Sequence, residues 1–104
     1  MKYVLMFTPQ EGGSEEERYE AARRAQQLLQ KFTPAKSATI HQWVTRIDGQ
    51  GGFSVVETDN EEDLLRDLTL WSSFVEFRCY PVIDIDRATP IVDAALRVRE
   101  SLPA

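Results

Sequence analysis

Two titratable residues in strand-like segments are candidates for proton transfer, His41 and Glu57. His41 is the only histidine, and imidazole exchanges protons readily near neutral pH. Glu57 closes an apolar strand, where a carboxylate stripped of water would serve as a general base. Structural roles are open alternatives for both residues. Glu57 could equally be an exposed acid at the end of a strand or the ion-pair partner of Arg46 across a hairpin. His41 could equally be a surface residue or a packing residue.

Three larger side chains are candidates for ligand contact: Trp43, Arg78 and Tyr80. The two aromatic residues would line a pocket for a flat organic molecule, since pockets are mostly apolar with a few polar groups. Arg78 would hold a carboxylate or a phenolate. Packing in a core or dimer contact is the alternative for Trp43 and Tyr80. For Arg78 it is a salt bridge with Glu76 or Glu57.

The spacing of the remaining residues indicates no metal or cofactor site. One histidine and one cysteine do not make a recognisable ligand set. The glycine-rich run at 49–52 joins two predicted strands, whereas a phosphate-binding loop joins a strand to a helix. We therefore expect a turn at this run, no metal and no cofactor. Cys79, the single cysteine, is expected to be a small core residue.

Periodicity and capping residues define the elements that must position these side chains. Strands are expected at 2–8, 39–48, 53–58 and 74–84. One helix follows a capping box at Ser14–Glu17 and runs to about Phe32. A second begins after a cap at Asp59 or Asn60, with Trp71 on its buried stripe together with Leu64 and Leu68. Thr89–Pro90 is expected to begin a last helix.

The order βαββαβ with one more helix predicts an α+β, ferredoxin-like fold with an antiparallel sheet in the strand order 4-1-3-2. Both crossover helices would cover one face of the sheet and leave the other face bare, which favours pairing with a second copy. Alternation turns Val75, Phe77, Cys79, Pro81 and Ile83 toward the helices and places Arg78 and Tyr80 opposite. His41, Trp43 and Glu57 share one face, provided that no bulge shifts the hairpin register.

The run from Trp43 to Asp84 resembles a bacterial family known only as a domain of unknown function, in the dimeric α/β-barrel superfamily. The resemblance is carried by the turn-and-strand run that ends in residues 55–59, by Trp71 and by the spacing of Phe77, Pro81–Val82 and Asp84. The family often has a histidine directly after the strand tryptophan, where this chain has Val44. The resemblance implies a homodimer. The superfamily includes cofactor-free monooxygenases, isomerases, cyclases, haem-handling proteins and stress proteins.

Length and charge narrow the remaining possibilities. The 104 residues suffice for a single domain, which we place at 1–104. The net charge of −5 argues against a nucleic-acid partner. A single cysteine suits a reducing compartment, and no segment has the character of a signal peptide or a membrane span. The sequence thus predicts a cytoplasmic protein without a nucleic-acid or membrane partner.

The sequence favours a homodimer that binds a small organic molecule in a cleft on the sheet. A first alternative is a cofactor-independent enzyme of monooxygenase, isomerase or cyclase type, acting on a small aromatic or polyketide-like substrate. Glu57 or His41 would then be the base, and Arg78 or Tyr80 would stabilise the developing oxyanion. A second alternative is a protein-interaction module. An enclosed cleft that holds a titratable pair would favour the enzyme. A dry sheet face that is filled by side chains would favour the interaction module.

Overall fold

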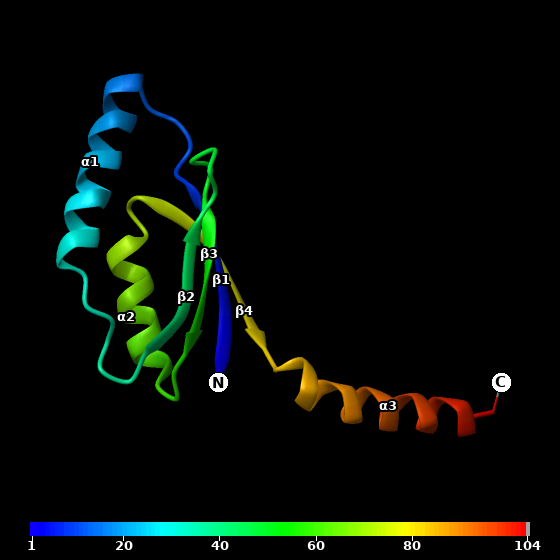
Figure 1. Cartoon of the computed structure of the whole chain (residues 1–104). Coiled ribbons are helices and arrows are strands. Elements are labelled where there is room, and N and C mark those ends of the chain that lie inside the picture. Colours follow the sequence, from blue (N-terminus) through cyan, green and yellow to red (C-terminus); the bar gives the residue numbers. More distant parts are fainter. Residues whose placement is uncertain (104) are drawn as a thin grey trace.

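The computed structural model describes residues 1–103, and its elements follow the order βαββαβα (Figure 1). Seven elements make up this part of the chain: β1 (Lys2–Pro9), α1 (Glu15–Lys31), β2 (Thr39–Thr45), β3 (Gly52–Glu57), α2 (Glu61–Trp71), β4 (Val75–Val82) and α3 (Ile85–Ser101). This is the predicted α+β, ferredoxin-like fold with a helix added at its end.

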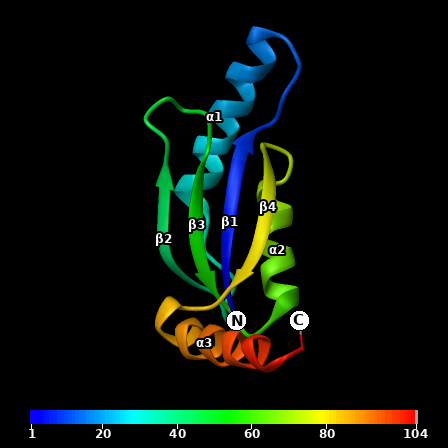
Figure 2. The same ribbon diagram turned by 90° about the vertical axis from the view of Figure 1, so that its right-hand side faces the viewer.

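The four strands form one antiparallel sheet in the order β2-β3-β1-β4, which is the predicted order read from the opposite edge (Figure 2). β1 lies in the interior of the sheet and pairs with both β3 and β4. Pro81, which has no N–H to donate to a ladder, lies on the edge strand β4, as a proline in a strand requires.

Alternation along the strands sends one set of side chains to the core beneath the helices. Tyr3 and Leu5 of β1, Val56 of β3 and Leu64 of α2 form its buried centre. Phe77 packs against them, which confirms the predicted inward set of β4 at this residue. Figure 1 shows α1 and α2 together on this side of the sheet.

Both crossover helices begin at the caps that the sequence predicts. The Ser14 hydroxyl accepts a hydrogen bond from the Glu17 backbone N–H at 3.1 Å, and the Asn60 side chain accepts from Glu62 and Asp63. The acidic residues of each first turn lie near the positive end of the helix dipole. These local interactions fix where the two covering helices start.

The last helix begins at Ile85, so the predicted start at Thr89–Pro90 is wrong. The Asp84 carbonyl accepts from the N–H groups of Arg87 and Ala88 at 3.0 and 2.9 Å, which nucleates the helix directly after β4. The Thr89 hydroxyl donates to the Ile85 carbonyl at 2.8 Å instead of capping a helix. Pro90 lies inside α3, where its missing N–H removes one helical hydrogen bond.

α3 extends away from the rest of the molecule and does not cover the bare face of the sheet (Figures 1 and 2). Its large apolar side chains remain exposed, including Ile91 and Val98 at 61% each. The sheet face opposite α1 and α2, here called the open face, likewise exposes Met6 at 48% and Tyr80 at 46%. The protein therefore carries two uncovered apolar surfaces.

The glycines at the end of the β2–β3 hairpin allow close backbone approach. Gly51 has φ +120°, a conformation that L side chains rarely adopt. A Cβ on Gly52 would lie 2.8 Å from Phe7 Cζ and 2.8 Å from Thr45 Cα. Gly52 thus lets the hairpin pass over the Phe7 ring.

We predict that Gly52→Ala lowers the free energy of unfolding by about 3 kcal/mol, because the added methyl group meets side chain and backbone at once. Gly49→Ala is the matched control, since its Cβ would meet nothing within 4 Å and its φ of +74° is the only strain. That strain costs about 1 kcal/mol. Urea denaturation of both variants checks the difference, and equal losses would contradict this account of Gly52.

Candidate functional site

A cavity of about 560 Å³ lies between the sheet and the helices α1 and α2. Its size falls in the usual range for small-molecule sites, roughly 300–1,000 Å³. The walls are mainly apolar: they include Leu5 and Phe7 from β1, Ala25 and Leu29 from α1, Ile40 from β2, Val56 from β3, and Leu64 and Leu68 from α2. The cavity is therefore suited to a largely apolar molecule.

Aromatic rings form one wall of the cavity. The Trp43 ring meets those of Phe32 and Trp71 edge to face, with centroids 5.9 and 5.7 Å apart. Phe32 and Trp71 also meet in this way at 5.5 Å, so the three rings form a mutual cluster. Trp71 lies on the inward stripe of α2 as predicted, and it also lines the cavity.

The polar side chains in the cavity wall are few, and two of them bind backbone groups. Thr45 Oγ1 donates to the Gly51 carbonyl at 3.1 Å. The Asp67 carboxylate accepts the Ala35 backbone N–H at 2.9 and 3.2 Å and pairs with Arg66. Asp67 is the only charged residue in the lining, and no lysine or arginine is among the residues that form it.

A β-bulge at His41 separates the residues that the sequence analysis grouped together. Ile40 is opposite Val56 and Gln42 is opposite Val55, so two residues of β2 span one step of β3. Trp43 is consequently opposite the buried Ser54 and faces the helices. His41 instead contacts Glu57 on the open face. The prediction that His41, Trp43 and Glu57 share one face is wrong for Trp43, because this bulge shifts the register.

His41 and Glu57 form an imidazole–carboxylate pair at the end of the open face. His41 Nε2 and Glu57 Oε1 lie 2.7 Å apart, and the two side chains are 43% and 51% exposed. The alternative pairing of Glu57 with Arg46 is not formed, because Arg46 binds Asp48 within the turn. The arrangement orients the ring, but it stands outside the cavity.

Lys2 and Asp84 form a second ion pair, with Nζ and Oδ1 2.6 Å apart. The hydrogen bond between them raises the pKa of Lys2 and lowers the pKa of Asp84. Asp84 directly precedes α3, so this pair ties the start of that helix to β1.

Arg78 and Tyr80 also lie on the open face, as alternation predicts. Arg78 is opposite Met6 and Tyr80 opposite Val4 in the register between β1 and β4. No ion pair of Arg78 with Glu76 or Glu57 occurs within residues 1–103.

Of the five predicted site residues, only Trp43 lines the cavity. Cys79 is exposed on the edge strand, so its expected place in the core is wrong.

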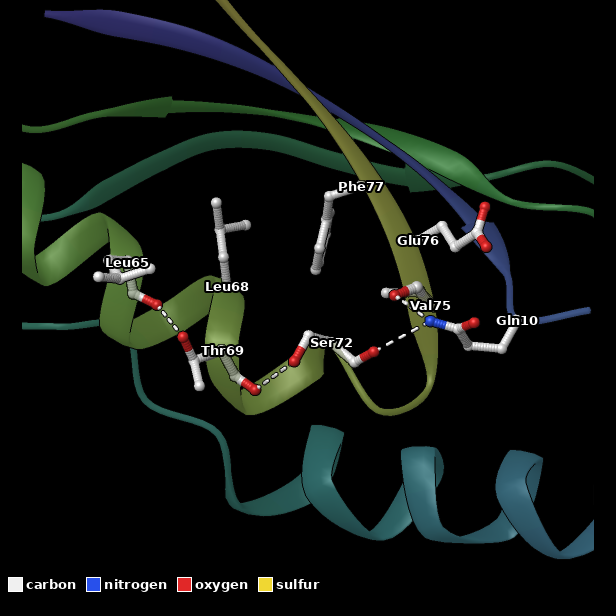
Figure 3. A pocket seen from close by; sticks show the side chains of 8 residues that line it. All are labelled: Gln10, Leu65, Leu68, Thr69, Ser72, Val75, Glu76 and Phe77. Atoms are coloured by element: carbon white, nitrogen blue, oxygen red, sulfur yellow. Dashed lines mark hydrogen bonds between the residues drawn. The ribbon is translucent and has the colours of Figure 1, made fainter.

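A second, shallower hollow of about 480 Å³ lies between α2 and β4 (Figure 3). It shares Leu68, Val75 and Phe77 with the larger cavity. Gln10 Nε2 closes one end by donating to the carbonyls of Ser72 and Val75 at 3.1 and 3.2 Å. The Thr69 and Ser72 hydroxyls in its wall donate to carbonyls of their own helix, as Figure 3 shows. These polar groups serve the local backbone.

Sequence reasoning missed Ser54, Phe32 and Asp67 as parts of the cavity wall. Ser54 gave one usable signal, because it is a small polar residue at an inward position of an otherwise apolar strand. Phe32 and Asp67 gave none, because an aromatic residue that ends a helix and an acid on a helix surface are common features.

The protein thus has a ferredoxin-like fold with a cavity between the sheet and the helices α1 and α2. The chain belongs to the family described as a domain of unknown function (DUF3303), whose model matches residues 1–96. No curated protein matches it. It is similar to At3g17210 from Arabidopsis thaliana, in an ensemble-refined crystal structure, with 16% identity and a TM-score of 0.30. That match covers 81% of this chain and 96% of the other, and a likeness of this degree carries no argument.

Residues 1–103 contain neither a metal-binding cluster of acidic, histidine or cysteine side chains nor a membrane-spanning helix. This part of the chain holds no group of three or more His, Cys, Asp or Glu side chains placed to bind a metal ion. None of its helices combines the length and the apolar character that crossing a membrane demands.

We predict that Asp67→Ala lowers the free energy of unfolding by about 2 kcal/mol, because the Ala35 N–H then loses a charged acceptor in a half-buried place. Asp67→Asn keeps one acceptor oxygen and should recover part of the loss. Asp93→Ala removes an exposed ion pair on α3 and should change stability by less than about 0.5 kcal/mol. Chemical denaturation ranks the three variants, and no loss in Asp67→Ala would show that this contact does not hold the α1–β2 loop.

Proposed function

We propose that this protein binds a small, neutral and largely apolar molecule in the cavity between the sheet and the α1–α2 layer. The observation that carries the proposal is the wall formed by Phe32, Trp43 and Trp71 around about 560 Å³ of space. A well-packed interior contains few voids larger than a water molecule, so a space of this size requires an explanation. A ligand that fills the cavity supplies one.

The charge of the lining supports a neutral ligand over an anionic one. Asp67 offers no positive charge to an anion, and Arg78, the cation expected to hold a carboxylate or phenolate, lies on the opposite face of the sheet. An anion in the cavity would lose its water without gaining a cationic partner, which is costly in an apolar site. A flat aromatic or polyketide-like molecule in its uncharged form suits this lining better.

We also propose that the protein is a homodimer of the dimeric α/β-barrel type, paired through the open faces of two sheets. The exposed apolar side chains Met6, Val44 and Tyr80 support this pairing, since uncovered apolar sheet surface favours a partner. Two copies related by a two-fold axis would cover both faces at once. A cytoplasmic location accompanies the proposal, because the single cysteine suits a reducing compartment.

Catalysis without a cofactor is a second candidate function, and the His41–Glu57 pair favours it. A carboxylate that orients an imidazole is a recurring arrangement in general-base catalysis. The pair lies on the open face, so its substrate would bind there, between paired sheets, and not in the aromatic cavity. Binding in the cavity remains the primary proposal because that site lies between two layers and is lined by aromatic rings.

The cavity can be tested with N-phenyl-1-naphthylamine, a neutral probe that fluoresces strongly in apolar surroundings. We predict that the probe binds the wild-type protein and that Ala25→Phe weakens binding at least about tenfold, because the added ring occupies the cavity. Tyr80→Ala, on the open face, should leave probe binding unchanged. Binding that is lost in Tyr80→Ala but kept in Ala25→Phe would move the site to the open face.

The dimer can be tested by light scattering at micromolar concentration. We predict a mass about twice the 11.9 kDa of one chain for the wild type. Met6→Glu places a charge on the open face and should return the mass to one chain, because an unpaired charge in an apolar interface is costly. Tyr19→Glu, at a side chain that is 66% exposed on α1, is the matched control and should stay dimeric. A wild-type mass near 11.9 kDa would refute the pairing.

A further inference from the structure

We propose that the Ser54 hydroxyl is the polar anchor of the cavity and selects a neutral aromatic molecule with one hydrogen-bonding oxygen, such as a phenol or an aromatic ketone. The inference rests on the proposed function, because it names the ligand class of the same site. In this role Ser54 would favour an oxygen-bearing neutral ligand over a plain hydrocarbon and over an anion.

Ser54 lines the cavity from the side of the sheet. It is the third residue of β3 and lies opposite Leu5 of β1 and Trp43 of β2. Its inward neighbours along β3 are Gly52 and Val56, so two of three successive inward positions carry small residues. Ser54 itself lines the cavity, which places the hydroxyl beside a molecule bound there.

The hydroxyl of Ser54 has no partner of its own. The residue is only 6% exposed, yet its side chain makes no hydrogen bond within residues 1–103. No polar side-chain atom in this part of the chain is both completely enclosed and without a partner. Ser54 Oγ must therefore border the open space of the cavity, where only a ligand or water can satisfy it.

Packing alone does not account for a serine at this position. A hydroxyl removed from water without a new hydrogen bond costs roughly 1–3 kcal/mol, whereas alanine would carry no such cost. Thr45 and Asp67 also line the cavity, but both are committed to backbone groups. Gln26 lines it from α1 at an exposed position. Ser54 is thus the deep polar group available to a ligand.

The surroundings of the hydroxyl define the ligand that it would bind. A serine hydroxyl both donates and accepts one hydrogen bond, so it matches a phenol or a carbonyl oxygen. The neighbouring Trp43 ring, in its cluster with Phe32 and Trp71, would contact the flat part of the same molecule. Because the lining offers no cation, a charged oxygen would be less favourable than a neutral one.

The test compares three probes of one shape: 2-naphthol, 2-methylnaphthalene and 2-naphthoate. Each is titrated at pH 7 into ¹⁵N-labelled protein, and amide and indole chemical shifts give the affinity and location of binding. We expect 2-naphthol to bind most tightly and to shift the signals of Ser54 and Trp43. Ser54→Ala should weaken 2-naphthol about five- to tenfold, the loss of one neutral hydrogen bond, and leave 2-methylnaphthalene unchanged.

Two further variants keep the test sharp. Ser54→Cys preserves the approximate volume and replaces the hydroxyl with a poor hydrogen-bonding thiol, so it should behave like Ser54→Ala toward 2-naphthol. Ser73→Ala removes an exposed hydroxyl from the α2–β4 turn, outside the cavity lining, and should bind all probes as the wild type does. Melting temperatures confirm that each variant is folded at the temperature of titration.

The outcomes separate the two proposals. If the wild type binds 2-naphthol in the cavity and both Ser54 variants bind it equally well, the anchor is refuted and the binding site stands. If 2-naphthoate binds best, the neutral class is refuted. If the wild type binds neither neutral probe at the limit of its solubility, the proposed function itself is overturned.

Discussion

One extra residue in β2 determines which chemistry this sheet presents on each side. The bulge at His41 leaves Ile40 facing the helices and returns Trp43 to the same side two steps further along β3. Without it, strict alternation from Ile40 would place Trp43 on the open face and remove one of the three rings of the aromatic cluster. The same extra residue turns the imidazole toward Glu57. The aromatic cavity and the imidazole–carboxylate pair therefore depend on a single irregularity in one edge strand.

The cavity also depends on the small size of several side chains in its wall. Ser54 of the inward row of β3 is a small residue in the cavity wall, and it lies opposite Trp43 of β2 and Leu5 of β1. On the helix side α1 contributes the small residues Ala22 and Ala25 as well as Leu29. Small residues in both layers leave unfilled the space that larger side chains would occupy. The resulting site follows from side-chain size as much as from side-chain chemistry.

Much of the fold was readable from the sequence because it depends on local patterns. The inward set of β4, the caps at Ser14 and Asn60, and the strand order follow from alternation, capping chemistry and the rules of the split βαβ unit. The candidate site was harder to predict. A bulge leaves no composition signal of its own, so the sequence pattern groups Trp43 with His41 and Glu57 on one face. The early start of α3 was hidden by Thr89–Pro90, a sequence that favours a helix start wherever it occurs.

The short junction between β4 and α3 gives the protruding helix a hinge. α3 has 17 residues and so is about 25 Å long, and only Ile83 and Asp84 connect it to the sheet. A rotation of about 20° at this hinge would carry its far end through about 9 Å, by the length of a helix at 1.5 Å per residue. The Lys2–Asp84 pair restrains the hinge while Asp84 is ionised and Lys2 protonated. The lowered pKa of Asp84 and the raised pKa of Lys2 widen, at both ends, the pH range in which both partners are charged. Acid therefore breaks the pair and frees the start of α3 only as the pH falls through the lowered pKa of Asp84.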